Sequence, residues 1–96
     1  MNYIISYDIS NHKLRKDLSD YLISNNFIRI QKSVFLGNID TENLFNKITF
    51  LNHFLDDKID SILICPLCND DFEKSYFLGQ TFDLKNFEKF KNFILF

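Results

Sequence analysis

Several residue types are scarce in this 96-residue chain, and each scarcity excludes a class of protein. Two glycines and one proline are too few for a disordered or repetitive chain, and 46% of the residues are hydrophobic, so a compact core can form. Two cysteines, Cys65 and Cys68, are too few to staple a small secreted fold. No apolar run approaches the roughly 18 residues of a membrane-spanning helix, and the first residues lack the pattern of a secretion signal. We expect a cytoplasmic protein with no membrane partner.

The length of the chain supports one hydrophobic core. We therefore assign residues 1–80 to a single domain and residues 81–96 to a C-terminal extension, in which Phe87, Phe90 and Phe93 recur at every third position. The formal net charge of −2 gives the protein no overall attraction to nucleic acid. DNA or RNA can bind only where lysine and arginine gather locally.

The periodicity of apolar residues predicts the element order β-α-β-β-α-β. The predicted strands cover residues 2–8 and 61–65, and two more short strands lie within 27–39 and separate near Lys32-Ser33. The predicted helices are residues 11–24 and a second helix that is capped by Asp40 and extends to Leu55. This order is typical of the ferredoxin-like α+β fold, in which a four-stranded antiparallel sheet carries two helices on one face. A fifth strand is expected over residues 75–79.

Both faces of the predicted sheet are apolar. The first strand presents Tyr3 and Ile5 to one face and Ile4 to the other, and the strand 61–65 presents Leu63 and Ile64 to opposite faces. When helices cover one side of an antiparallel sheet, the other side is normally exposed to water and polar. We therefore expect a homodimer formed through the sheet face, with the phenylalanine-rich extension completing the dimer or contacting another protein.

Five short motifs resemble a known family. The chain carries Tyr7-Asp8-Ile9-Ser10 at the end of the first strand, the basic Lys13-Leu14-Arg15-Lys16 at the start of the first helix, Gln31-Lys32-Ser33-Val34-Phe35 in the middle strands, Cys65-Pro66-Leu67-Cys68 at the end of the fourth strand and Leu78-Gly79 in the fifth. In this order and spacing, residues 1–80 resemble the Cas-two family of small CRISPR-associated proteins. The resemblance implies a ferredoxin-like homodimer that works with the Cas-one integrase in acquiring spacers from foreign DNA. Several members are also described as metal-dependent endonucleases on RNA or double-stranded DNA.

The resemblance places the family's catalytic and metal-binding aspartate at Asp8. One carboxylate cannot hold a hard cation alone, but two Asp8 residues related by a two-fold axis, helped by carbonyls and waters, could hold one Mg²⁺. Such an ion activates water and stabilises charge on a phosphodiester. The alternative role of Asp8 is to turn the chain before the first helix or to help cap that helix.

Basic residues near Asp8 are candidates for phosphate contacts. Lys13, Arg15 and Lys16 lie in the first turns of the first helix, where backbone N–H groups add positive potential. Arg29 and Lys32 on the middle strands are the next candidates. The alternative is a solvated face, which is the usual role of a short basic run.

Four further residues are expected to support the site. We assign Tyr7 and Ser10 to the motif around Asp8, Ser33 either to ordering a metal-bound water or phosphate or to the break between two strands, and Phe35 to packing. The Cys65–Cys68 pair has the spacing of half a zinc site, but no second cysteine pair accompanies it. A redox role requires a helix N-terminus, whereas this motif ends a strand. We interpret both thiols as small apolar residues.

Two functions of different kinds fit these residues. The first is a dimeric adaptor that bridges Cas-one integrase dimers and carries the incoming DNA duplex on its basic residues. The second is a Mg²⁺-dependent endonuclease acting on RNA or DNA through the Asp8 pair. A toxin-type ribonuclease resembling VapD, which shares the small dimeric fold, is a third interpretation.

Overall fold

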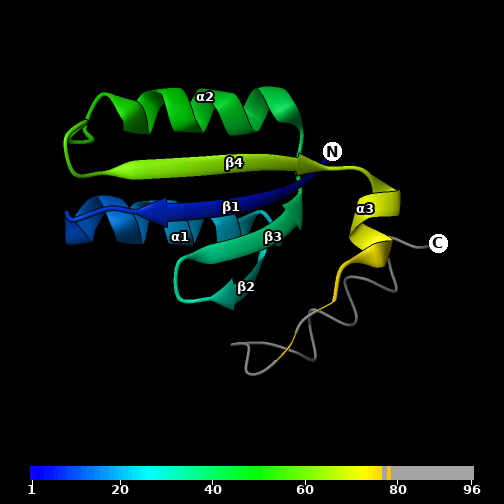
Figure 1. Cartoon of the computed structure of the whole chain (residues 1–96). Helices are drawn as coiled ribbons and strands as arrows, with labels where there is room; N and C mark the ends of the chain where they lie inside the picture. The colour runs from blue at the N-terminus through cyan, green and yellow to red at the C-terminus, as the bar shows by residue number, and fades with distance from the viewer. Residues whose placement is uncertain (77, 79–96) are drawn as a thin grey trace.

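The computed structural model describes residues 1–76 and 78. Their elements are β1 (Asn2–Asp8), α1 (His12–Ser24), β2 (Ile28–Gln31), β3 (Val34–Asn38), α2 (Thr41–Asn52), β4 (Ser61–Leu67) and α3 (Asn69–Lys74) (Figure 1). The strands form one four-stranded sheet in the order β2-β3-β1-β4, and every neighbouring pair is antiparallel. The predicted element order and the four-stranded antiparallel sheet are confirmed.

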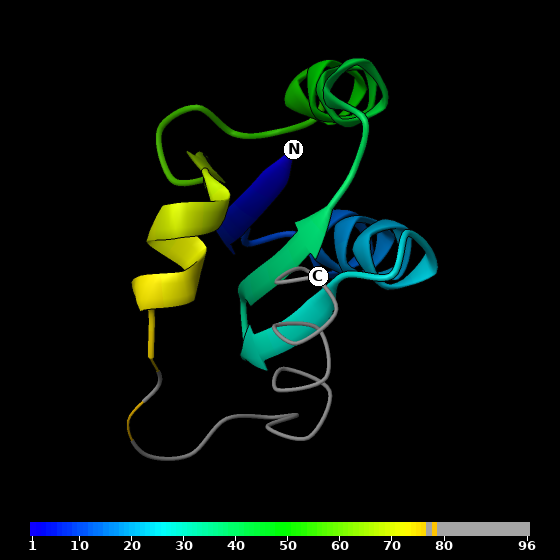
Figure 2. The ribbon, with the colours of Figure 1, turned by 90° about the vertical axis from the view of Figure 1, so that its right-hand side faces the viewer.

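The core lies between the sheet and the two longer helices. Tyr3, Ile5 and Tyr7 alternate along β1 towards α1 and α2, and all three are buried. Leu18 and Leu22 of α1 and Leu44 and Leu51 of α2 complete the same buried cluster. Figure 2 shows α1 and α2 on one face of the sheet and α3 on the other. The second face is called the open face below.

Side-chain caps set the helix boundaries. The Asn11 side chain accepts a hydrogen bond from the backbone N–H of Leu14, so Asn11 caps α1. Asn26 then takes a positive φ of 66°, a conformation that ends a helix, and α1 ends at Ser24 as predicted. Asp40 caps α2 as predicted, but α2 ends at Asn52, short of the predicted end of its apolar stripe.

The open face is partly covered by α3, which the sequence analysis did not predict. Phe72 of α3 is buried against Ile30 and Leu36, with Ile4 and Leu67 packed around them. Ser75, Tyr76 and Leu78, the described residues of the predicted fifth strand, lie in no strand. Residues 77 and 79–96, which include the whole extension 81–96, are outside the described residues. Within the chain itself, a short helix therefore covers part of the face that we expected a second copy to cover.

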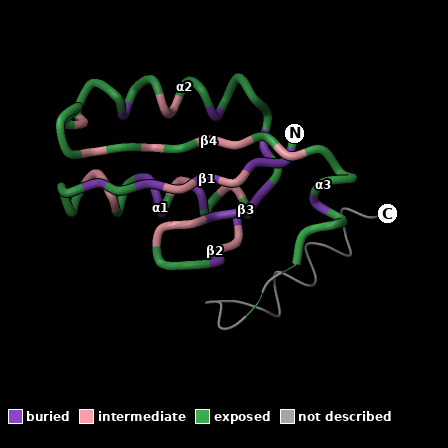
Figure 3. The backbone as a smooth tube through the Cα atoms, in the orientation of Figure 1, coloured by how far each residue is buried: buried purple, intermediate pink, exposed green. Residues whose placement is uncertain are grey.

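The edge strand β4 is the most exposed strand of the sheet. None of its residues is buried, and the Leu63 side chain on the open face is 58% exposed (Figure 3). The strand continues through Pro66 to Leu67, beyond its predicted end at Cys65. Proline has no backbone N–H, but an edge strand tolerates it because only one side of the strand is hydrogen-bonded to a neighbour. No helix of the described part of the chain is long and apolar enough to cross a membrane.

A crowded contact fixes β3 against the chain that follows α1. A Cβ atom added to Gly37 would lie 2.4 Å from Cγ of Phe27, which is far below normal contact distance. The Phe27 ring therefore occupies the space that a side chain at position 37 would need. Only glycine allows the ring and the strand to approach this closely.

A carboxylate joins two loops that are far apart in sequence. Oδ1 of Asp60 accepts hydrogen bonds from the backbone N–H (2.8 Å) and the hydroxyl (2.9 Å) of Ser10, and its Oδ2 accepts one from the N–H of Asp56 (2.9 Å). The backbone hydrogen bond from Ser10, and after it the one from Asp56, lowers the pKa of Asp60 from its ordinary value of 3.8. The loop before β4 is thus fastened to the loop that follows β1.

The lowered pKa of Asp60 predicts how stability depends on pH. Because the folded-state pKa is depressed, the stabilisation is fully present above the ordinary value of 3.8 and is lost as pH falls through the lower folded-state pKa. Asp60→Asn should therefore lower the midpoint of thermal unfolding at pH 7 and flatten its fall in acid. The matched control Asp57→Asn removes an exposed charge from the same loop without touching Ser10. Acid profiles that coincide for wild type and Asp60→Asn would refute this role.

Candidate nucleic-acid and metal site

Four segments meet at one end of the sheet. They are the end of β1, the start of α1, the turn between β2 and β3, and the loop that precedes β4 (Figure 1). Asp8 ends β1 opposite Ser61, the first residue of β4. This end of the sheet is called the Asp8 end below, and it holds most of the predicted site residues.

Asp8 is exposed and lies on the open face. Tyr3, Ile5 and Tyr7 point to the helices, so the alternation of the strand turns Asp8 to the opposite side. Its carboxylate makes no hydrogen bond or ion pair with the residues that the structure describes. Those residues also contain no group of three or more His, Cys, Asp and Glu side chains that could hold a metal ion. A divalent cation at Asp8 therefore needs ligands beyond those that one described chain brings together.

The three basic residues of α1 differ in what they contact. Lys16 pairs with Asp20 at 2.7 Å, and both side chains are mostly exposed. Arg15 donates from Nη1 to the carbonyl of Ile9 at 2.9 Å, and its Nη2 lies 3.1 Å from Nδ1 of His12. Lys13 is exposed and forms no ion pair within the described chain. Arg15 thus braces the loop after Asp8, and Lys13 is the basic side chain most available to a phosphate.

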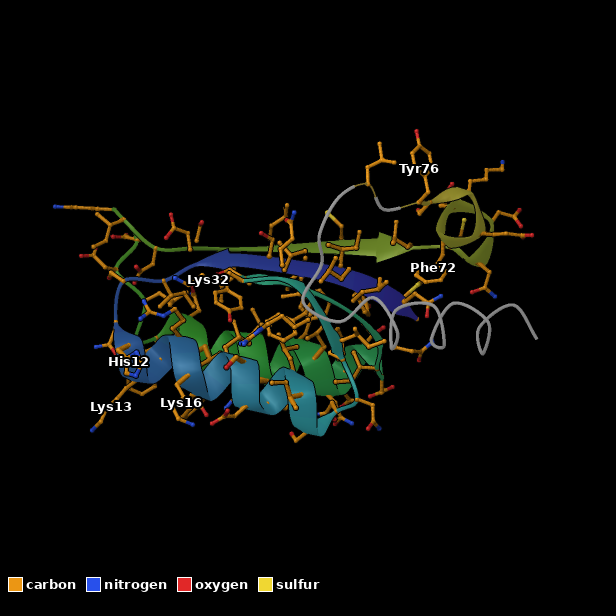
Figure 4. The ribbon with its side chains drawn as sticks, turned by 90° about the horizontal axis from the view of Figure 1, so that it is seen from below. His12, Lys13, Lys16, Lys32, Phe72 and Tyr76 are labelled. Carbon is orange, nitrogen blue, oxygen red and sulfur yellow. The ribbon has the colours of Figure 1, made fainter. Side chains whose placement is uncertain are left out.

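The structure separates the two basic residues of the middle strands. Arg29 is half-buried, and its guanidinium carbon lies 5.0 Å from the centre of the Phe35 ring on the helix side of the sheet. Lys32 is exposed in the turn between β2 and β3, and the carbonyl of the next residue, Ser33, accepts a hydrogen bond from the N–H of Tyr7 at 3.1 Å. The turn therefore adjoins the end of β1. Figure 4 shows Lys32, Lys13 and His12 at this end of the molecule.

The four residues predicted to support the site, Tyr7, Ser10, Ser33 and Phe35, lie at or beneath the Asp8 end. Phe35 is fully buried, as expected for packing, and its ring stacks on that of Tyr7 with centroids 6.0 Å apart. Ser33 lies at the predicted break between two strands. Ser10 is held by Asp60, a residue that the sequence analysis did not select. No local pattern could have selected it, because the contact spans 50 positions of the chain.

The interpretation of the cysteines needs correction. Both thiols are free, but Cys68 is exposed and caps α3 instead of packing in an apolar environment. Its Sγ donates to Oδ2 of Asp71 at 3.1 Å and accepts from the N–H of Asp71 at 3.4 Å. The Cys65–Cys68 motif therefore covers both the end of β4 and the cap of α3. The acidic residues Asp70 and Asp71 in the first turn, followed by Lys74 in the last, were the available signal for this helix.

Comparison with known proteins agrees with this geometry. A family model described as CRISPR associated protein Cas2 matches residues 1–75. A hypothetical protein from Thermus thermophilus, TT1823, has a similar structure with a TM-score of 0.66 and 28% identity, over 83% of this chain and 92% of its own. Cas2 of Streptococcus pyogenes, at 21% identity, shares the fold with a TM-score of 0.68 over 82% of this chain and 100% of its own. With more than half of its length matched by the family model, this chain belongs to the CRISPR-associated Cas-two family.

Proposed function

We propose that this protein is a dimeric adaptor of CRISPR adaptation, which joins Cas-one integrase dimers and holds the DNA that they integrate. The match of residues 1–75 to the family model carries the proposal, because it covers the whole sheet and the Asp8 end. The chemistry of the Asp8 end supports an adaptor more than an enzyme. Asp8, Lys13 and Lys32 are exposed there, and the described residues contain no group of three or more His, Cys, Asp and Glu side chains that could hold a metal ion within one chain.

The open face supports dimer formation. It carries a groove of about 260 Å³ lined by residues that include Ile4, Leu36, Phe72 and Tyr76. Leu63 adds an exposed apolar side chain on the same face. Large exposed apolar surfaces mark sites where proteins associate. A second copy related by a two-fold axis covers this face in the proposed dimer, and the two Asp8 residues lie on the surfaces that meet.

A shared metal site follows from the same arrangement. The Asp8 carboxylates suit Mg²⁺, which prefers oxygen ligands and retains several waters. When bound, such an ion supplies activation of water and stabilisation of charge on a phosphodiester. The chain's own contribution is to hold Asp8 at the end of β1, where it pairs with Ser61 of β4, and Arg15 fixes the carbonyl of Ile9 beyond it. The proposal therefore includes a metal-dependent endonuclease activity in addition to the adaptor function.

Dimer formation and integrase binding are tested with Leu63→Glu. We expect the variant to be monomeric by light scattering, because it places a charge on the open face, and to lose the ability to join two integrase dimers. Ile23→Glu on α1 is the matched control, since Ile23 is also exposed (51%) but faces away from the sheet. A monomeric wild type, a dimeric Leu63→Glu, or a wild type that does not bind the purified integrase would refute the adaptor.

The role of Asp8 is tested by cleavage of end-labelled RNA and duplex DNA. We expect wild type to cleave in Mg²⁺ and not in EDTA, and Asp8→Ala to be inactive while remaining a dimer, because the metal loses its ligands. Asp20→Ala is the control, since Asp20 is exposed and paired with Lys16 away from the open face. Equal cleavage by Asp8→Ala, or none by wild type, would leave the adaptor without an attached activity.

The DNA contacts are tested by the salt dependence of duplex binding. Removing both Lys13 and Lys32 by alanine substitution should weaken binding at least ten-fold. The slope of log K against log salt should fall by about 0.9 for each lost phosphate contact. Lys16→Ala should have a smaller effect, because Asp20 already neutralises Lys16. An unchanged slope in the double variant would place the DNA elsewhere on the protein.

A further inference from the structure

Two aromatic side chains are exposed at the end of α2 and in the turn that follows it, and the proposed adaptor function does not involve them. Phe50 is 55% exposed and Phe54 is 57% exposed. Their rings lie side by side with centroids 5.3 Å apart. Burying an exposed phenylalanine side chain is favourable, so two of them on one surface provide a driving force for association. Single exposed apolar residues are common, but an adjacent pair is a candidate contact site.

A lysine connects this pair to α1. Nζ of Lys47 lies 5.6 Å from the centre of the Phe50 ring and 5.4 Å from that of Tyr21, and it pairs with Asp17 at 2.9 Å. The Lys47 side chain is only 20% exposed, so its charge is partly covered and is neutralised by Asp17. Tyr21, Lys47, Phe50 and Phe54 therefore form one continuous surface, called the α2 aromatic patch. It lies on the helix layer, on the side of the sheet opposite α3 (Figure 2).

The surroundings of the α2 aromatic patch are negative. The last turn of α2 contains no basic residue, so the negative end of the helix dipole has no cationic side chain in that turn. The exposed carboxylates Asp56 and Asp57 follow Phe54 by two and three positions, and the exposed Lys58 balances one of them, which leaves this loop with a net negative charge. This charge disfavours phosphate groups, whether of nucleic acid or of an anionic membrane, and favours a basic partner.

We infer that the α2 aromatic patch docks a segment of a partner protein that carries apolar side chains flanked by lysine or arginine. The apolar side chains cover Phe50 and Phe54, and the basic groups face Asp56, Asp57 and the end of α2. Aromatic residues surrounded by a polar rim are the usual anchors of such contacts. The surface is small, so the contact is of the weak and transient class. This surface lies on the helix layer, whereas Asp8 lies on the open face, and the loop with Asp56 and Asp57 borders both. The inference does not depend on the proposed function.

The inference is tested by NMR titration of the isotope-labelled full chain with two designed helical peptides. Both peptides carry the same apolar residues, flanked in one by lysines and in the other by glutamates. We expect the lysine peptide to shift the amide signals of α2 and of Tyr21 and to bind at least ten-fold more tightly than the glutamate peptide. Phe50→Ser with Phe54→Ser should reduce its affinity at least ten-fold.

Phe45→Ser is the matched control. Phe45 is also exposed on α2 (48%), but at 100° per residue it points about 140° away from Phe50 around the helix axis. The control should keep the wild-type affinity, and preserved dispersion of the amide signals shows that each variant is folded. Equal binding of both peptides, shifts confined to the open face, or an equal loss in Phe45→Ser would overturn the inference. So would self-association or binding to anionic vesicles that the Phe50 and Phe54 substitutions abolish, because the occupant would then be a second copy or a membrane.

Discussion

The pairing of β1 is the interaction on which the rest of the structure depends. β1 is hydrogen-bonded to β4 from Asn2 to Asp8 and to β3 from Asn2 to Ser6. One of its faces supplies Tyr3, Ile5 and Tyr7 to the main core, and Ile4 on the other face supports the cluster under α3. A central strand with neighbours on both sides cannot shift by one residue without exchanging these two faces. The position of Asp8 on the open face is therefore fixed by the core and does not depend on the loop that follows.

Patterns within short stretches of sequence were sufficient for most of the fold. The apolar stripes of α1 and α2 and the caps Asn11 and Asp40 are local signals, because a cap acts on the N–H groups of its own helix. The helix α3 was missed since its six residues contain one buried apolar side chain, Phe72, and so no periodicity. The strand expected over 75–79 was inferred from β-forming residues alone, with no partner strand to specify it.

The candidate site could be predicted in part. Asp8, Lys13 and Lys32 come together at one end of the sheet because the antiparallel order brings the end of β1 to the turn between β2 and β3. The contacts of Arg15 and Arg29 were not predictable, since each depends on a neighbour supplied by the folded chain: the carbonyl of Ile9 for one and the Phe35 ring for the other. Charge type can be read from a sequence, but the availability of a charge depends on tertiary contacts.

The contact between Gly37 and Phe27 has a consequence for how relatives of this protein can differ. The ring lies where any other residue at position 37 would place its Cβ atom, so the two positions share one volume. A larger residue at 37 is tolerated only when the residue at 27 becomes smaller. Because Phe27 lies between α1 and β2, such a change also alters how the chain leaves the helix. Positions 27 and 37 should therefore vary as a pair during evolution, although they lie ten positions apart in the sequence.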